Sequence, residues 1–357
     1  MHRPPTVLVT GAAGFIGAAV TERLLAAGAR VLALDDLSAG DPARLEALAR
    51  DGLEVVHGDA SDGALLGELL REAPGAVVHL AGRVGVRTVL ADPEACEREN
   101  VELGAAVAEA IARRASGPSR PRVLAASTSE VYAESSDPLS EESALRAAEA
   151  VGRWRYAASK LASEEAFDAA LDGSGQGAVH LRFFNVVGPG QDGSTGMVLP
   201  RFVEAARAGA PLTVHGEGES VRTFAHVESV AADIAALALP DLLADGPAAA
   251  RCARFEGALN LGGTARATVL ELAREVGRAA ERRGAPPASI VHVDPRVTVS
   301  PRFAEVHHRV PDLSRVRALG LCAAPWTLAD LVDDVVVRHV APRPARAGSP
   351  RCASHVS

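Results

Sequence analysis

Two side chains with the spacing of neighbours on a helix could remove a proton from an alcohol. Tyr156 and Lys160 lie four residues apart in the stretch YAASK, and a helix would project both side chains from one face. A free tyrosine has a pKa of about 10 and is a poor base at neutral pH. Because a neighbouring ammonium group favours the phenolate, the pair is suited to general-base chemistry. Taken alone, the spacing also fits an ordinary amphipathic helix.

A second polar group, Ser127-Thr128-Ser129-Glu130, follows an apolar run that predicts a strand over residues 122–126. Hydroxyl groups at the carboxyl end of a central strand lie where ligands bind in open α/β sheets. A buried serine or threonine there could share the proton of a substrate alcohol. Glu130 could exchange a proton with carbon or steer a substrate, and its alternative role is a helix cap or a salt bridge.

A glycine-rich loop with Gly11, Gly14 and Gly17 separates a predicted strand over residues 6–10 from a predicted helix over residues 15–28. One glycine allows a tight turn, the next lets the backbone approach a pyrophosphate, and the third lets helix and strand pack closely. The helix N-terminus then offers free N–H groups and a partial positive charge to the phosphates. This pattern indicates a dinucleotide site, and an oxidised nicotinamide bound there would further favour a tyrosine phenolate.

An acidic residue at the end of the second predicted strand discriminates between dinucleotides. Asp35 lies 18 residues after Gly17, and a carboxylate at this place accepts both ribose hydroxyls of NAD and repels the 2′-phosphate of NADP. Asp36 adds to this preference. Asp59, after the third predicted strand, is expected either to hydrogen-bond the adenine or to form a plain turn. The sequence therefore predicts NAD as the cofactor.

Short apolar segments alternate with amphipathic ones over the first half of the chain. Strands are predicted over residues 6–10, 30–34, 53–57, 76–80, 122–126 and 180–184. Such alternation is typical of a parallel sheet covered by helices on both faces. The predicted fold class is α/β, a Rossmann doubly wound parallel sheet with a smaller carboxyl-terminal substrate-binding lobe. In that lobe we expect a helix over residues 199–208, a strand over 212–215 and a surface loop over 241–254.

Composition limits the possible classes of function. The chain has 357 residues, 48% of them apolar, and a formal net charge of −8 without a long basic run, which argues against a nucleic-acid partner. The cysteines share no metal-ligand spacing, so free thiols and no metal site are expected; they are Cys96, Cys252, Cys322 and Cys352. The sequence shows neither a signal-peptide pattern nor a membrane-spanning apolar run, and a cytoplasmic protein is expected.

With these motifs in place, the chain resembles the extended short-chain dehydrogenase/reductase family, in its branch of nucleotide-sugar epimerases, dehydratases and decarboxylases. The matching segments run in family order over about nine-tenths of the chain. They are TGAAGFIG (10–17), LDDLSAG (34–40), HGDASD (57–62), HLAG (79–82), ENVELG (99–104), STSEVY (127–132), YAASK (156–160), RFFNVVGPGQ (182–191), RTFAHVESVA (222–231) and NLGG (260–263).

The resemblance implies roles for the matching residues. Tyr156 would be the base at the sugar C4 hydroxyl, helped by Thr128 and held by Lys160, which would also bind the nicotinamide ribose. Ser129 and Glu130 would complete the catalytic group. The NAD site would comprise Gly11, Gly14, Phe15, Ile16, Gly17, Asp35, Asp36, Ser38, Gly40, Asp59, Ala60, Leu80, Ala81, Gly82, Asn100, Ser127, Tyr156, Lys160 and Phe183. The substrate site would comprise Thr128, Asn185, Val198, Arg222 and Arg309, with Asn185 beside the sugar diphosphate and both arginines on the pyrophosphate.

Three departures from the family pattern bear on the reaction. Ala133 replaces the usual glycine after VY, and Gly82 replaces the second alanine of HLAA. Ser129 replaces the aspartate of Thr-Asp-Glu in the glucose dehydratases, where that aspartate protonates the leaving C6 hydroxyl. Thr-Ser-Glu is similar to UDP-glucuronate decarboxylases and to GDP-mannose dehydratases, and Asp35 disfavours the latter because they prefer NADP. The segments RWRY (153–156) and MVLPRFV (197–203) resemble bacterial enzymes that act on UDP-uronates.

The leading prediction is a UDP-glucuronate decarboxylase that works through a transient 4-keto sugar and recycles its bound NAD. The alternatives are a 4-epimerase of UDP-glucuronate or another UDP-hexose, an NDP-hexose 4,6-dehydratase and, in another class, a non-catalytic NAD-binding sensor.

The expected domains follow the same pattern. Residues 1–186 would form the NAD-binding domain, with 222–262 returning to it, and residues 187–340 would form mainly the nucleotide-sugar-binding lobe. Residues 341–357 are expected to be a disordered tail. The resemblance also implies a homodimer through a four-helix contact that includes the helix of Tyr156 and Lys160. No membrane partner is expected.

Overall fold

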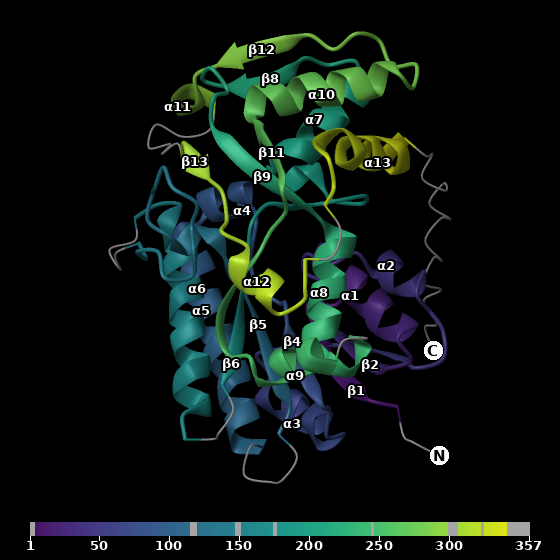
Figure 1. Cartoon of the computed structure of the whole chain (residues 1–357), viewed down its shortest axis with the longest axis vertical. Coiled ribbons are helices and arrows are strands. Elements are labelled where there is room, and N and C mark those ends of the chain that lie inside the picture. Colours follow the sequence, from purple (N-terminus) through teal and green to yellow (C-terminus); the bar gives the residue numbers. More distant parts are fainter. Residues whose placement is uncertain are drawn as a thin grey trace, which may run out of the picture.

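The centre of the molecule is a seven-stranded parallel sheet (Figure 1). The computed structural model describes residues 4–114, 120–146, 151–173, 177–243, 246–298, 306–322 and 325–340. The strands of the sheet lie in the order β10-β6-β5-β4-β1-β2-β3, and each neighbouring pair is parallel. Their bounds are β1 Thr6–Thr10, β2 Arg30–Asp35, β3 Leu53–His57, β4 Ala76–His79, β5 Arg122–Thr128, β6 Ala178–Phe183 and β10 Gly257–Leu261.

The strand order changes direction at β1. The chain builds β2 and β3 outward on one side of β1 and then returns through β4 on the other side. In sheets of this kind, ligands bind in the crevice at the carboxyl ends of the two strands that flank the change. Here β1 and β4 end in Thr10 and His79, and the Thr10 hydroxyl lies 2.8 Å from Nδ1 of His79. This hydrogen bond fixes the two sides of the crevice relative to one another.

Helices cover both faces of the sheet because its strands are apolar on both faces. In β1, Val7 and Val9 belong to the core beneath α1 (Phe15–Ala26) and α8 (Val227–Ala238), while Leu8 belongs to the core on the opposite face. Alternate residues of a strand point to opposite faces, so a strand covered on both sides must be apolar throughout. The opposite face is covered by α3 Gly63–Arg71, α5 Pro93–Arg114 and α6 Trp154–Leu171.

A smaller lobe lies above the carboxyl ends of the strands, at the top of Figure 1. It has its own apolar core, in which helices pack against a four-stranded sheet (β11-β9-β13, with β7 on β9) and the parallel pair β8-β12. Among its elements, α10 begins with a capping box between Thr268 and Glu271. The bounds are β7 Val186–Val187, α7 Val198–Arg207, β8 Leu212–His215, β9 Val221–His226, β11 Ala265–Thr268, α10 Val269–Glu281, β12 Ile290–Val293, α11 Pro295–Thr298, β13 His308–Arg309 and α13 Leu328–Val340.

Short helices complete the described chain; they are α2 Pro42–Glu46, α4 Val86–Ala91, α9 Gly246–Arg254 and α12 Ser314–Ala318. The α/β class and all the predicted strands are confirmed, with end residues shifted by two positions at most. The surface loop predicted over residues 241–254 is wrong, because most of this segment is α9. Alanine favours helix, and Ala248 and Cys252, four residues apart, bury one face of it. The tail predicted over 341–357 lies outside the described residues. No helix in the described ranges is long and apolar enough to cross a membrane.

Candidate active site

The glycine loop packs so closely against the chain after β4 that a side chain at Gly11 is excluded. Gly11 has φ of +69°, and a Cβ atom added to it would lie 2.6 Å from the backbone nitrogen of Ala81. A Cβ on Gly17 would collide with the carbonyl oxygen of Gly11. Helix α1 starts directly after Gly14, and no side chain caps its N-terminus. The first turn therefore keeps backbone N–H groups for a ligand at the crevice, which fits the pyrophosphate of a dinucleotide.

Asp35 connects this loop to the end of β2. Its Oδ2 accepts a hydrogen bond from the Ala13 N–H at 2.9 Å, and its Oδ1 accepts one from the Leu37 N–H at 2.8 Å. Gly40 lies against it, since a Cβ there would be 2.7 Å from Oδ1. Each carboxylate oxygen has capacity for a further donor such as a ribose hydroxyl. The residues at the predicted adenosine end thus fit NAD, and the negative charge at this place opposes a 2′-phosphate.

The other acidic residues predicted near the adenosine have local partners. The Asp36 carboxylate accepts hydrogen bonds from the backbone N–H and the hydroxyl of Ser38, at 3.0 and 2.8 Å. Asp59 accepts one from the N–H of Ser61 at 2.7 Å. Both are turn contacts. Direct roles of Asp36, Ser38 and Asp59 in cofactor binding stay predictions.

Thr128 and Tyr156 lie together where β5 ends, and Lys160 follows on the next turn of the Tyr156 helix. Thr128 is the last residue of β5, and its hydroxyl lies close enough to the Tyr156 phenol to lower the pKa of Tyr156 slightly. Tyr156 and Lys160 occupy neighbouring turns of α6, as their spacing predicts. Burial lowers the pKa of Lys160 to about 8. Burial, followed by the negative charge of Glu130, raises the pKa of Tyr156 above its ordinary value, so the phenol needs added positive charge nearby to act as a base.

The loop after β4 packs against Lys160. Gly82 has φ of +154°, and a Cβ there would lie 3.1 Å from the Lys160 Nζ and 3.2 Å from Oδ1 of Asn100. Asn100 holds the next residue by accepting the Arg83 N–H at 2.7 Å and donating to the Arg83 carbonyl at 3.0 Å. Cys96 is fully buried beside Asn100. A glycine at position 82, where the family often has alanine, gives the lysine ammonium room next to the backbone.

Glu130 is held by two arginines from distant parts of the chain. Its Oε1 accepts hydrogen bonds from Arg153, at the start of α6, at 2.9 Å and from Arg309 of β13 at 3.1 Å. Burial by itself would raise the pKa of Glu130, but the charges and hydrogen bonds of Arg309 and Arg153 outweigh it and hold the pKa at about 2. Glu130 is therefore ionised at neutral pH, close enough to influence Tyr156. Ser129 lies beside it, buried in a 3₁₀ turn.

The predicted substrate contacts lie along the boundary between the sheet and the smaller lobe. Asn185, with φ of +34°, donates its side-chain amide to the Thr223 carbonyl at 2.9 Å. Arg222 and Arg309 are register partners on β9 and β13, and Arg222 donates to the backbone carbonyl of Val306 at 2.6 Å. Val198 begins α7. Asn185, Arg222 and Arg309 are thus connected through β9, and Arg309 also binds Glu130, which acts on Tyr156.

A cavity of about 570 Å³ opens beside α7. Its lining includes two arginines, Arg87 and Arg201, together with Phe202, Pro211 and Thr213. None of its lining residues is one of the predicted reacting groups.

The remaining predicted cofactor residues lie at the ends of strands or at the start of α1. Phe15 and Ile16 begin α1 and pack against the core beneath it, and Phe183 ends β6. Leu80 and Ala81 directly follow β4, and Ala60 is buried after β3. Within the described residues, no three His, Cys, Asp or Glu side chains gather as metal ligands would.

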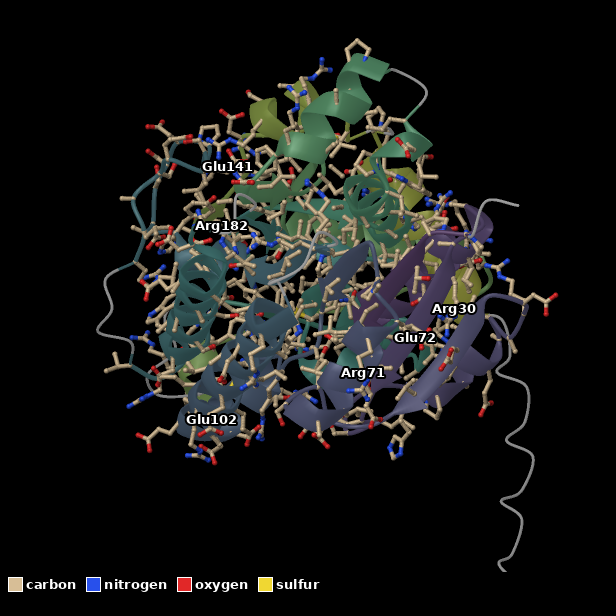
Figure 2. All side chains as sticks on the ribbon, turned by 90° about the horizontal axis from the view of Figure 1, so that it is seen from below. Arg30, Arg71, Glu72, Glu102, Glu141 and Arg182 are labelled. Atoms are coloured by element: carbon tan, nitrogen blue, oxygen red, sulfur yellow. The ribbon has the colours of Figure 1, made fainter. Side chains whose placement is uncertain are left out.

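Sequence reasoning missed a buried polar network behind the reacting groups. Ser127 donates to Glu164 of α6, and Glu164 makes a bidentate pair with Arg182 of β6 at 3.0 and 2.7 Å. Arg182 also donates to the Tyr132 hydroxyl at 3.1 Å. In Figure 2, Arg182 lies inside the molecule, far from the surface pair Arg30 and Glu72. A signal was present, because Tyr156, Lys160 and Glu164 follow one another at four-residue steps on one helix face.

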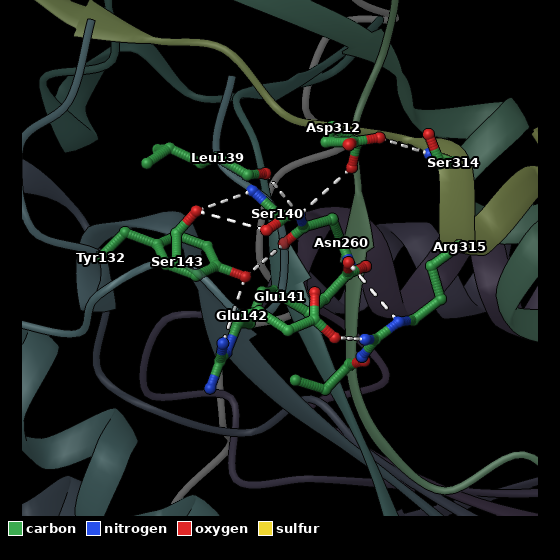
Figure 3. Close-up of polar contacts among 12 residues, drawn as sticks. Tyr132, Leu139, Ser140, Glu141, Glu142, Ser143, Asn260, Asp312, Ser314 and Arg315 are labelled. Carbon is green, nitrogen blue, oxygen red and sulfur yellow. Dashed lines mark hydrogen bonds and ion pairs between the residues drawn. The ribbon is translucent and has the colours of Figure 1, made fainter. Parts of the chain in front are cut away.

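Asn260 of β10 extends this network to the segment that carries Arg309 (Figure 3). Its Oδ1 accepts the Tyr132 hydroxyl at 2.7 Å, and its Nδ2 donates to the carbonyl oxygens of Leu139 and Asp312 at 2.8 and 3.2 Å. Leu139 in turn pairs with the backbone around Pro311. The polar contacts therefore run from the catalytic helix to the chain just after β13.

The crevice, its glycine loop and the tyrosine–lysine pair define a Rossmann enzyme of the dehydrogenase/reductase class. Residues 7–244 match the model of the NAD dependent epimerase/dehydratase family, and the chain belongs to this family of NAD-dependent enzymes. The predicted family, enzyme class and cofactor are confirmed.

Individual relatives act on nucleotide sugars. A UDP-N-acetyl-alpha-D-glucosaminuronate decarboxylase of Bacillus cytotoxicus is 29% identical over 87% of this chain and 90% of its own. The UDP-glucose 4-epimerase of Thermus thermophilus in complex with NAD has a TM-score of 0.75 at 26% identity and covers 94% of this chain and 98% of its own. MoeE5 in complex with UDP-glucuronic acid and NAD has a TM-score of 0.73 at 27% identity, over 93% and 98% of the two chains.

Proposed function

We propose that the protein is an NAD-dependent decarboxylase of a UDP-linked glucuronate. The observation that carries the proposal is the Glu130 carboxylate, which two arginines keep ionised beside Tyr156. Because Glu130 is ionised, the reacting end of the site lacks a carboxylic acid, and the two arginines on Glu130 give it an excess of positive charge. A substrate that brings its own carboxylate, and whose reaction needs no acid at C6, suits such a site.

The first step rests on Tyr156. Bound NAD would supply the hydride acceptor at the sugar C4 and later the donor that returns the hydride. Tyr156 takes the proton of the C4 hydroxyl, and the neighbouring Thr128 hydroxyl shares that proton, since it already acts on the phenol. Lys160 contributes a buried positive charge on the same helix face, which favours the phenolate. The product of this step is a 4-keto sugar.

The second step separates the candidate reactions. With a carboxylate at C6, the 4-keto sugar is a β-keto acid. Its C5–C6 bond breaks, the electron pair moves into the C4–C5 enolate, CO₂ leaves, and water returns a proton to C5. Expelling a C6 hydroxyl instead requires an acid at C6 and a base at C5. Glu130, with a pKa of about 2, is neither a proton donor at neutral pH nor an effective base, so it disfavours 4,6-dehydration.

The two ends of the substrate would lie in different parts of the molecule. We place the sugar at Tyr156 and Glu130 and the nucleotide in the cavity beside α7, with Arg222 and Asn185 between them. In this arrangement residues 1–186 and 222–262 hold the cofactor, and residues 187–340 mainly hold the nucleotide sugar. We further propose a cytoplasmic homodimer, formed through α5 and α6, which pack side by side (Figure 1). Light scattering would give its mass.

The test is incubation of the purified protein with UDP-glucuronate and with UDP-N-acetylglucosaminuronate, followed by NMR of the products and detection of CO₂. The expected result is a UDP-pentose, or its N-acetylamino counterpart, with one CO₂ per turnover. If the product is UDP-galacturonate and no CO₂ is released, the protein is a 4-epimerase and the decarboxylase assignment is wrong. Unchanged uronates together with turnover of UDP-glucose would overturn the assignment of a uronate substrate.

A further inference from the structure

A tryptophan two residues before the reacting tyrosine contacts two arginines. Trp154 is the first residue of α6. The guanidinium carbon of Arg146 lies 3.6 Å from the centre of its ring, and that of Arg153 lies 4.7 Å away. Guanidinium groups stack on aromatic faces because of cation–π attraction and weak hydration. The ring therefore fixes two positive groups near Tyr156, which follows two residues later.

Hydrogen bonds hold Arg146 in place, but one nitrogen of its guanidinium group has no hydrogen-bond partner among the described residues. Its backbone N–H donates to the Val131 carbonyl at 2.7 Å, which pairs it with the chain next to Glu130. One terminal nitrogen donates to the Tyr132 carbonyl at 3.3 Å. Its Nε is buried and has no hydrogen-bond partner among the described residues. A buried donor without an acceptor is costly, so this nitrogen points to an acceptor that a ligand supplies.

The charges around Arg146 identify that ligand as an anion. Arg146, Arg153 and Arg309 form a guanidinium cluster around Glu130, and burial followed by the charge of Arg309 lowers the pKa of Arg146. Glu134 also acts on Arg146, although its carboxylate already accepts the His307 N–H at 2.9 Å. Within the part of the chain that the structure describes, Arg146, Arg153 and Arg309 are the three positive groups of the cluster. The carboxylates that act on Arg146 are two, Glu130 and Glu134. A partly buried excess of positive charge is stabilised by an incoming carboxylate.

We propose that Arg146, held against Trp154, binds the C6 carboxylate of the substrate and makes the site selective for uronates over neutral hexoses. The inference rests on the proposed function, which places the C4 hydroxyl at Tyr156 and Thr128. The C6 carboxylate is attached to C5, the neighbour of C4, so it lies within a few bonds of the hydroxyl at Tyr156. Glu130 and Arg309 of the guanidinium cluster both act on Tyr156, which brings the cluster within reach of that carboxylate. Arg146 is then a specificity residue, and Trp154 positions it.

The test measures binding of UDP-glucuronate, UDP-glucose and UDP to the NAD-loaded protein by calorimetry. In Arg146→Met the affinity for UDP-glucuronate is expected to fall about 10- to 100-fold, because one charge-assisted pair is lost. The affinities for UDP-glucose and UDP are expected to stay within about twofold of wild type. Trp154→Leu, which removes the ring under Arg146, is expected to reduce the same selectivity. Arg155→Met is the matched control, because Arg155 pairs with Glu94 and Glu97 of α5 instead.

The outcomes separate this inference from the proposed function. If the wild-type protein binds UDP-glucuronate no better than UDP-glucose, the proposed uronate function fails. If the wild type prefers the uronate and Arg146→Met and Trp154→Leu keep that preference, the inference alone is wrong. An equal loss of affinity for all three nucleotides would also overturn it, since Arg146 would then support the fold and not the carboxylate.

Discussion

Replacing Glu164 by Gln is expected to destabilise the protein and to shift its activity profile at the same time. Glu164 lies one helical turn after Lys160 on α6 and binds Arg182 through both carboxylate oxygens. The side chains of Glu164 and Arg182 are only 10% and 5% exposed, so water cannot replace the lost charge. Removing one partner of a buried pair costs about 3–5 kcal/mol, because the other charge stays buried. In domains of 150–250 residues, 1 kcal/mol of stability corresponds to about 2–4 °C in melting temperature, and the lower value applies to this longer chain. The melting temperature should therefore fall by about 6–10 °C.

The catalytic effect of Glu164→Gln comes through Lys160. Burial lowers the pKa of Lys160 to about 8, and the Glu164 carboxylate opposes that shift. Without the carboxylate, the pKa of Lys160 falls further, the ammonium loses its proton at lower pH, and the alkaline limb of kcat moves down. Differential scanning fluorimetry and a kcat–pH profile measure the two effects. Glu165→Gln is the control, since Glu165 is the exposed neighbour on the same helix. A melting temperature within about 2 °C of wild type, or an alkaline limb that does not move, would refute the reasoning.

Three further predictions concern the reacting groups and the cofactor. Tyr156→Phe should lower kcat about 10²- to 10⁴-fold with little change in melting temperature, because it removes the proton acceptor alone. A kcat within threefold of wild type would contradict the role of the phenol. In the wild-type protein kcat should decline as pH rises through about 8, where Lys160 loses its proton. Lys160→Arg should move that decline to higher pH. If the decline stays at the same pH in the arginine variant, it belongs to the titration of another group. Asp35→Asn should raise the affinity for NADP relative to NAD about tenfold by removing the charge that opposes a 2′-phosphate, as measured by nicotinamide fluorescence, and an unchanged ratio would remove Asp35 from cofactor discrimination.

Much of the fold and part of the site could be predicted because their signals are local. The predicted strands contain short apolar runs. The glycine loop has the spacing that a close approach of backbones requires, as the position of Gly11 against Ala81 illustrates. Tyr156 and Lys160 are four residues apart on a helix, so their proximity follows from helix geometry alone. Helix α9 was not predicted, because the Gly and Pro at its start are also typical of a loop.

The partners of the reacting groups could not be predicted because they come from distant parts of the chain. Glu130 and Arg309 are 179 residues apart in sequence, and only the pairing of β13 with β9 brings them together. Arg146 lies over the Trp154 ring in a fold where residues 144–146 pair with the chain at residues 131–133. Asp36 has a local partner instead, because its carboxylate accepts hydrogen bonds from Ser38. The sequence alone does not distinguish such a turn contact from a contact with a ligand.

The central claim is that Tyr156 and bound NAD oxidise C4 of a uronate and return the same hydride after CO₂ has left. The most direct test is turnover of UDP-glucuronate carrying deuterium at C4, with no NAD added beyond what the protein holds. The account predicts a UDP-pentose that retains the deuterium at C4 and many turnovers per bound cofactor. A product without deuterium at C4, or a reaction that stops after one turnover, would contradict it.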